Sequence, residues 1–159
     1  MTTRLDPMIF GEDSPCFGCA PHHPVGLRLT FDKSDEEVVT RYLPPERFQG
    51  PPGIMHGGLV STLADEIGAW TVVAFKQRFG FTAAMDLRFK APVRIGREVV
   101  GRGRLIEDRS RIVKVEVTLE QDEVLALTGT FTFAVYDVAG AERLLGTELP
   151  EAWRRFGRP

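Results

Sequence analysis

A glycine-rich segment that leads into a long apolar run, residues 53–78, restricts the possible folds more than any other part of the sequence. The apolar spacing after His56-Gly57-Gly58 predicts a helix of about 20 residues that ends near Arg78. Its apolar side chains lie around most of its circumference, which is typical of a helix that is buried or spans a membrane. Polar residues interrupt this run, so it is shorter than the roughly 18 consecutive apolar residues that a membrane span requires. We therefore predict a buried central helix, in which Asp65 and Glu66 need partners or a function, because an unpaired buried carboxylate is costly.

The composition fits one globular domain with a sizeable core. The chain has 159 residues, of which 43% are hydrophobic and 26% are charged, so a disordered chain is not indicated. Its net charge is −2 and its Lys and Arg residues are spread along the chain, which argues against a dedicated nucleic-acid-binding protein. The first residues lack the apolar core of an export signal. We therefore expect a cytoplasmic protein without a membrane partner, in which the two cysteines stay reduced.

Alternation of apolar and polar residues predicts a hairpin before the helix and four strands after it. The predicted strands are residues 26–32, 37–43, 81–90, 98–106, 111–120 and 124–135. The links between them are short, which makes neighbouring strands antiparallel. The predicted fold is therefore α+β, with a curved antiparallel sheet of about six strands wrapped around one long helix. We divide the chain into a loose lead-in (1–15), a main domain (16–137) and a C-terminal tail (138–159) with weak helical potential.

A Cys-x-x-Cys motif, Cys16 to Cys19, is followed closely by His22 and His23. One interpretation is a metal site, but a zinc finger or ribbon requires a second ligand pair, and two adjacent histidines cannot easily face one ion. A redox motif would require a βαβ context, which does not follow. We favour a tight turn that holds two small buried thiols.

The order and spacing of several motifs resemble the hotdog-fold acyl-CoA thioesterases, in particular the phenylacetate-pathway (PaaI-like) type and its animal cytosolic and mitochondrial relatives. The resemblance runs from about Cys16 to Asp137. The residues that carry it are Cys16-Phe17-Gly18-Cys19, Gly26-Leu27, Gln49-Gly50-Pro51-Pro52-Gly53, His56-Gly57-Gly58, Asp65, Phe89-Lys90-Ala91-Pro92 and Gly96. The resemblance implies a hotdog fold and hydrolysis of an acyl-CoA. We expect neither a cofactor nor a metal at the active site.

The chemistry of thioester hydrolysis agrees with these residue types. The backbone N–H groups of Gly57 and Gly58 at a helix N-terminus are candidate oxyanion donors, because neither residue has a Cβ to keep a substrate away. Asp65 is the candidate nucleophile or general base. Gly57 and Asp65 lie about 12 Å apart along a helix axis, too far to act on one carbonyl. We therefore predict sites shared across a twofold homodimer, which could associate further into a tetramer.

Two more residues are candidates for the catalytic site. In similar enzymes a Ser or Thr at the position of Thr82 orients the water or the carboxylate, although Thr82 is also an ordinary strand residue. His56 could contact the thioester or only brace its loop. Glu66 points about 100° away from Asp65 and is expected to be a structural or interface partner. Some relatives carry an Asn at the position of Gly50, and this chain contains no Asn.

The expected substrate contacts are basic residues near strand ends, because CoA carries phosphates. Lys90, Arg109 and Arg111 are the candidates, although charged turn residues are usually only solvated. Two alternatives remain open. One is a hotdog dehydratase or hydratase, which uses a His as its base in a different layout. The other is a non-catalytic protein that binds acyl-CoA or another ligand on the same scaffold.

Overall fold

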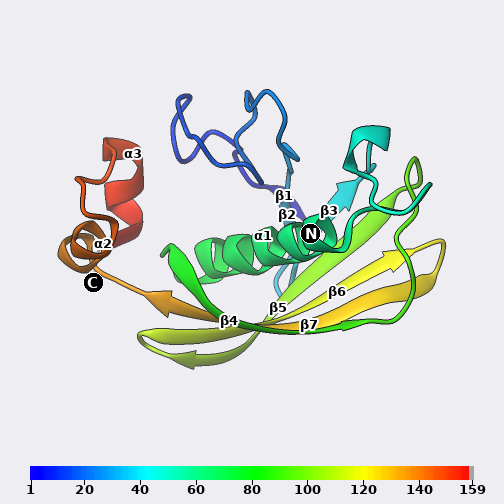
Figure 1. Ribbon diagram of the computed structural model, residues 1–159. Helices are drawn as coiled ribbons and strands as arrows, with labels where there is room; N and C mark the ends of the chain where they lie inside the picture. Colours follow the sequence, from blue (N-terminus) through cyan, green and yellow to red (C-terminus); the bar gives the residue numbers. More distant parts are fainter. Residues whose placement is uncertain (158–159) are drawn as a thin grey trace.

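A computed structural model describes residues 1–157 as one antiparallel sheet of seven strands with one long helix packed across it (Figure 1). The strands are β1 (Thr3–Arg4), β2 (Asp32–Lys33), β3 (Val38–Tyr42), β4 (Gly80–Phe89), β5 (Val99–Arg109), β6 (Ile112–Gln121) and β7 (Val124–Val135). The helices are η1 (Glu46–Phe48), α1 (Gly57–Lys76), α2 (Val138–Leu145), α3 (Glu151–Arg154) and η2 (Arg155–Gly157). The strand order is β1-β2-β3-β5-β6-β7-β4, so β4 lies at one edge.

The helix α1 confirms the central prediction from the sequence. It contains 20 residues, begins at Gly57 and ends at Lys76, where Gln77 adopts a left-handed conformation with φ of 54°. By length and composition it could span a bilayer, but its buried side chains pack against the sheet as those of a core helix do. Figure 1 shows the sheet curving around one side of α1, while the N-terminal segment lies on its other side.

Two glycines of β5 let α1 approach the sheet closely. Gly101 and Gly103 are two residues apart on the strand and therefore share a face. A Cβ at Gly103 would lie 2.2 Å from Thr71 Oγ1, and a Cβ at Gly101 would lie 2.3 Å from Ile67 Cδ1. Larger residues at these positions would push the helix off the sheet, so the close contact depends on the missing side chains.

The predicted first strand is largely absent, and this part of the prediction is wrong. Of residues 26–32 only Asp32 belongs to a strand, and β2 pairs with β3 over two residues. The N–H groups of Leu27 and Leu29 instead donate to the carbonyls of Phe17 and Gly18, both at 2.9 Å. Arg28 between them has φ of 53°, which an ordinary strand does not allow. The segment thus binds the loop of the Cys-x-x-Cys motif instead of extending the sheet.

The two ends of the chain are more ordered than the sequence predicted. Among the lead-in residues, β1 pairs with β2 and Phe10 is buried. The tail, expected to have weak helical potential, forms α2, α3 and η2 and buries Phe156. The rings of Phe10 and Trp153 lie 4.3 Å apart, and those of Phe10 and Phe156 lie 5.0 Å apart. Phe10 also contacts Trp70 of α1, at 5.9 Å between ring centroids, so the lead-in packs against the central helix and the tail packs against the lead-in.

Replacing a buried aromatic residue of the tail should therefore destabilise the whole protein. We expect Phe156→Ala to lower the free energy of unfolding by about 3–5 kcal/mol, because it empties a packed aromatic site. Leu144→Ala is the control, since Leu144 is exposed on α2 and should change stability by no more than about 0.5 kcal/mol. Urea unfolding at one fixed protein concentration measures both. Equal small effects would show that the tail does not contribute to the core.

Candidate functional site

The N-terminus of α1 presents one free backbone donor. Nδ1 of His56, the N-cap residue, accepts a hydrogen bond from the N–H of Gly58 at 3.0 Å. The N–H groups of Leu59 and Val60 donate to the His56 carbonyl at 2.9 and 3.0 Å. Within residues 1–157 the N–H of Gly57 has no protein acceptor, and a Cβ placed on Gly57 would meet nothing within 4 Å. Gly57 therefore offers an accessible donor at the positive end of the helix dipole, whereas Gly58 is already capped.

The loop before α1 holds His56 from several sides. The N–H of His56 donates to the Phe48 carbonyl at 2.9 Å. A Cβ at Gly50 would lie 3.2 Å from His56 Cα, so the glycine found where some relatives have Asn lets the loop fold against the histidine. The Gln49 side chain accepts a hydrogen bond from the N–H of Gly53 at 2.8 Å and so braces the loop itself. In this structure His56 is therefore hydrogen-bonded to its own loop and to the first turn of α1, as a bracing residue would be.

The structure brings Asp65 and Thr82 together. The Thr82 hydroxyl donates to Asp65 Oδ1 at 2.7 Å, which links the middle of α1 to β4. The pairing of β4 with β7 shifts register between Thr82 and Ala84, and bulges of this kind commonly redirect side chains at functional sites. Burial raises the pKa of Asp65, and the hydrogen bond from Thr82 partly lowers it. Asp65 is thus a half-buried carboxylate held in one orientation by a single hydroxyl group.

Glu66 faces a different part of the molecule from Asp65. Its Oε1 lies 3.4 Å from the Sγ atom of Cys16, in the loop that covers the outer side of α1. Burial, followed by the effect of Cys16, raises the pKa of Glu66 to about 8. The two adjacent carboxyl groups therefore occupy separate environments, and Glu66 does not share the site formed by Asp65 and Thr82.

Lys90 lies at the same end of the molecule as the free N–H of Gly57. Both residues line a cavity of about 370 Å3, together with apolar residues that include Val60 and Phe89. The cavity opens where β4 ends and α1 begins. A substrate that reaches the Gly57 N–H would therefore pass a lysine ammonium group.

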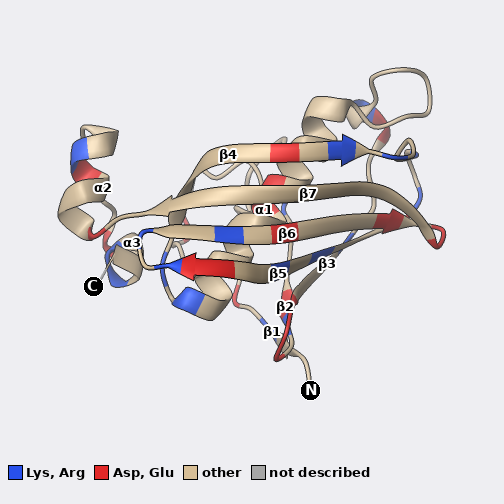
Figure 2. Ribbon diagram, turned by 90° about the horizontal axis from the view of Figure 1, so that it is seen from below, with Lys and Arg blue, Asp and Glu red and all other residues tan. Residues whose placement is uncertain are grey.

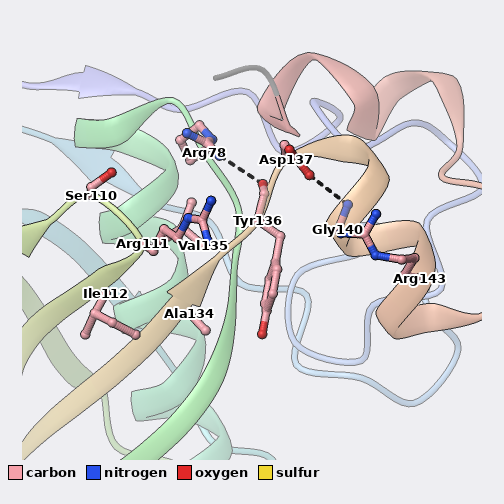
Figure 3. A pocket seen from close by; sticks show the side chains of 10 residues that line it. All are labelled: Arg78, Ser110, Arg111, Ile112, Ala134, Val135, Tyr136, Asp137, Gly140 and Arg143. Atoms are coloured by element: carbon pink, nitrogen blue, oxygen red, sulfur yellow. Dashed lines mark hydrogen bonds between the residues drawn. The ribbon is translucent and has the colours of Figure 1, made fainter.

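Arg111 lies at the opposite end of the sheet, in a cavity of about 580 Å3 that Figure 3 shows from close by. Two further arginines line it, Arg78 after α1 and Arg143 on α2, which sequence reasoning did not identify because they are far from Arg111 in the chain. Arg78 donates to the Tyr136 carbonyl at 3.0 Å, and its Nε atom is buried without a hydrogen-bond partner. The Asp137 carboxylate in this cavity caps α2 by accepting from the N–H of Gly140 at 2.7 Å.

None of the three cavity arginines forms an ion pair within residues 1–157. The cavity is therefore positively charged and suited to an anion. Arg109, the other predicted arginine, instead pairs with Glu107 at 2.6 Å and does not line the cavity. The structure thus places Arg111 in a basic site, Lys90 at the far end of β4, and Arg109 in a local ion pair.

The exposed edge of the sheet lies beside the candidate catalytic residues. The strand β4 contains ten residues and pairs only with β7, so it forms one edge of the sheet (Figure 2). Its side chains Met85 and Phe89 are exposed. A long unpaired edge with exposed apolar side chains readily pairs with another strand. Gly57 and Asp65 remain about 12 Å apart along α1, so one chain alone does not bring the free N–H and the carboxylate to one point.

Comparison with known proteins gives one matching family and several structural neighbours. The sequence model of the Thioesterase superfamily matches residues 52–127, which include α1, β4, β5 and β6. Acyl-coenzyme A thioesterase THEM4 from Rattus norvegicus is 26% identical over 111 residues, which are 69% of this chain and 47% of the rat protein. The chain thus spans about half the length of the curated relatives it matches.

Solved structures share the hotdog fold, in which an antiparallel sheet curves around one long helix. A phenylacetic acid degradation-related protein from Ralstonia eutropha JMP134 has a TM-score of 0.63 and 26% identity, covering 69% of this chain and 86% of that protein. A thioesterase protein from Streptococcus pneumoniae TIGR4, solved with coenzyme A, has a TM-score of 0.62 and 21% identity, covering 67% and 87%. The fold predicted from the resemblance is therefore confirmed.

The hydrogen bond from Thr82 to Asp65 can be tested by its effect on the pKa of Asp65. Because this bond favours the charged carboxylate, Thr82→Val should raise the pKa of Asp65 further, whereas Thr82→Ser keeps a hydroxyl group and should leave it nearly unchanged. Carboxyl-carbon NMR titration of Asp65 in the three proteins measures the shift. A pKa that is the same in the valine and serine variants would contradict the assignment of this bond.

Proposed function

We propose that this hotdog-fold chain, whose residues 52–127 match the Thioesterase superfamily model, hydrolyses an acyl-coenzyme A to a free acid and coenzyme A. The observation that carries this proposal is the half-buried Asp65 carboxylate, oriented by the Thr82 hydroxyl at 2.7 Å. A fixed carboxylate can attack a thioester directly or take a proton from an attacking water. The name of the rat relative and the coenzyme A bound to the streptococcal protein support this choice of substrate.

The Gly57 N–H is the proposed oxyanion donor. Attack on a thioester carbonyl places negative charge on its oxygen, and a preorganised backbone N–H at a helix N-terminus stabilises that charge. Gly57 fits this role because its N–H is free and its surroundings are open, whereas the Gly58 N–H is already bonded to His56. We therefore assign the donor to Gly57 and give Gly58 and His56 the task of fixing the first turn of the helix.

We propose that each site forms between two copies of the chain. Pairing of β4 with the β4 strand of a second copy would cover the exposed edge and extend the sheet across a twofold axis. The half-exposed face of α1 beside β4 carries small residues, Gly58, Thr62, Asp65 and Ala69, which allow two antiparallel helices to approach closely. In this arrangement Gly57 of one copy faces Asp65 and Thr82 of the other.

The same pairing would unite the two basic regions. A strand of ten residues spans about 33 Å, and antiparallel pairing places the start of one β4 beside the end of its partner. The cavity with Gly57 and Lys90 in one copy then lies next to the arginine cavity of the other. We propose that this second cavity, lined by Arg78, Arg111 and Arg143, binds the phosphates of coenzyme A while the thioester reaches Gly57.

The histidine geometry disfavours the dehydratase alternative. The Nδ1 atom of His56 accepts the Gly58 N–H at 3.0 Å, so this nitrogen is not free to act as a base. His22 and His23 lie in the loop between β1 and β2, and Nδ1 of His23 accepts from the N–H of Val25 at 3.3 Å. A non-catalytic binding protein would not need a carboxylate whose pKa is raised by burial, since that burial costs stability.

Loss of the Asp65 carboxylate should abolish turnover. We expect Asp65→Asn to lower kcat/KM at least about a hundredfold, the range for a lost general base. Asp122→Asn is the matched control, because Asp122 lies in an exposed turn with a positive φ that asparagine adopts easily. Release of free coenzyme A, followed with a thiol reagent over short, long and aromatic acyl-CoAs, measures both. Equal activity of the two variants would contradict the role of Asp65.

The Gly57 N–H can be removed without breaking the helix, since proline is tolerated at the first helical position. We expect Gly57→Pro to lower kcat by about 100- to 1,000-fold, as for other lost oxyanion donors. Gly57→Ala adds a Cβ that meets no atom of its own chain and keeps the N–H, so it should lose much less activity than Gly57→Pro. Circular dichroism checks that both variants fold. If proline and alanine at this position are equally active, Gly57 is not the donor.

If the arginine cavity binds the phosphates of coenzyme A, a mutation there should raise KM only for substrates that carry the nucleotide. We expect Arg111→Ala to raise KM for an acyl-CoA by about tenfold, the loss of one charge-assisted contact. The same variant should act normally on the matching acyl-pantetheine, which lacks the nucleotide. Arg97→Ala, at an exposed ion pair with Asp122, is the control. A KM that changes equally for both substrates would contradict phosphate binding at Arg111.

A further inference from the structure

Three metal-binding side chains meet on the outer side of α1, away from Asp65 and Thr82. One sulfur of Cys16, one sulfur of Cys19 and one carboxylate oxygen of Glu66 all lie within 4.8 Å of one another. The two sulfurs are 3.1 Å apart, and Cys16 Sγ lies 3.4 Å from Glu66 Oε1. Glu66 is 47 positions beyond Cys19 in the chain, so no local pattern indicates that the helix supplies a third donor to the Cys-x-x-Cys loop.

The loop is shaped to hold these donors against the helix. Gly18, between the cysteines, lies so close to Glu66 that a Cβ on it would be 2.1 Å from Glu66 Cγ. The N–H of Cys19 points at the Cys16 sulfur, with nitrogen and sulfur 3.4 Å apart, and the N–H of Ala20 donates to the Cys16 carbonyl at 3.1 Å. The carbonyls of Phe17 and Gly18 are in turn bound by Leu27 and Leu29. These contacts and hydrogen bonds hold the turn at residues 16–19 against the Glu66 carboxylate.

We propose that Cys16, Cys19 and Glu66 bind one zinc ion. Two thiolates and a carboxylate are typical zinc ligands, at about 2.3 Å for sulfur and about 2.1 Å for oxygen. In a tetrahedral site these lengths place two sulfurs about 3.8 Å apart and a sulfur and an oxygen about 3.6 Å apart. The observed distances are 3.1 Å between the two sulfurs and 3.4 Å between sulfur and oxygen. Both are within an ångström of the values for a zinc site, and rotation of the side chains supplies the difference.

The donor set differs from the one that the sequence suggests. His22 is exposed, and His23 packs its ring against Phe17 at 5.4 Å between centroids while its Nδ1 accepts the Val25 N–H. Within the described part of the chain, neither histidine belongs to the group of converging donors. Three protein ligands leave one position for water or a small thiol. Cys16 is only half-buried, so an ion can enter from solvent.

Such an ion would join the Cys16–Cys19 loop to α1 at the residue next to Asp65. Glu66 is the only one of the three ligands on the helix, and Cys16 and Cys19 lie in the loop that precedes β2. Zinc binding would therefore connect the Cys16–Cys19 loop to the helix that also carries the candidate catalytic carboxylate, Asp65. The proposal concerns a structural ion and does not depend on thioester hydrolysis.

The test uses the full-length chain, reduced and stripped of metal, and cobalt(II) as a spectroscopic substitute for zinc. The chain contains only two cysteines, so with a reductant that is not a thiol a thiolate-to-cobalt charge-transfer band in the near ultraviolet can come only from this pair. We expect one zinc per chain by elemental analysis of protein grown with zinc, and the cobalt band in the wild type. Cys16→Ser and Cys19→Ser should lose both signals, and Glu66→Gln should bind zinc about tenfold more weakly or worse.

His22→Ala and Glu98→Gln are the matched controls, because both residues are exposed and lie outside the donor group. Both should bind zinc as the wild type does. Absence of zinc and of the cobalt band in folded, reduced wild type would overturn the proposal, as would zinc binding that persists in both cysteine variants. Loss of zinc in His22→Ala together with normal zinc binding in Glu66→Gln would overturn the assignment of Glu66 as the third ligand. Because the wild-type cobalt spectrum decides the question, a variant that does not fold leaves the test intact.

Discussion

The close contact between α1 and the sheet is the constraint on which the rest of the structure depends. It requires Gly101 and Gly103, whose missing side chains leave room for Ile67 and Thr71. A helix enclosed in this way cannot leave polar groups without partners. Thr71 accordingly donates to the Ile67 carbonyl at 2.7 Å, and Asp65 accepts from Thr82. The enclosure thus explains why each polar side chain of the helix has a specific partner.

Because α1 is enclosed, the adjacent carboxylates Asp65 and Glu66 face different surroundings. Asp65 points to β4 at the open edge of the sheet, where a second copy can approach, and Glu66 points to the Cys16–Cys19 loop on the outer side. The rotation of about 100° between neighbouring helix residues produces this division. One helix can therefore carry a candidate catalytic group and a candidate metal ligand at consecutive positions.

Much of this arrangement could be predicted from the sequence, because it depends on local patterns. Periodicity located α1 and the four long strands, and the family resemblance singled out Asp65 and Thr82, which the structure places in contact. The predicted strand at residues 26–32 is largely absent because Leu27 and Leu29 bind a loop instead of a sheet. The packing of Phe156, the arginine cavity and the link from Glu66 to Cys16 involve residues far apart in the chain, for which no local pattern exists.

The most direct test of the shared site is subunit complementation between two inactive variants. Asp65→Asn and Gly57→Pro are produced with different tags, combined, and the mixed dimer is isolated by both tags. If Gly57 of one copy acts with Asp65 of the other, the mixed dimer contains one intact site and one site with both changes. We expect it to recover about half of the wild-type release of coenzyme A. A folded mixed dimer with no more activity than its parents would contradict the shared site.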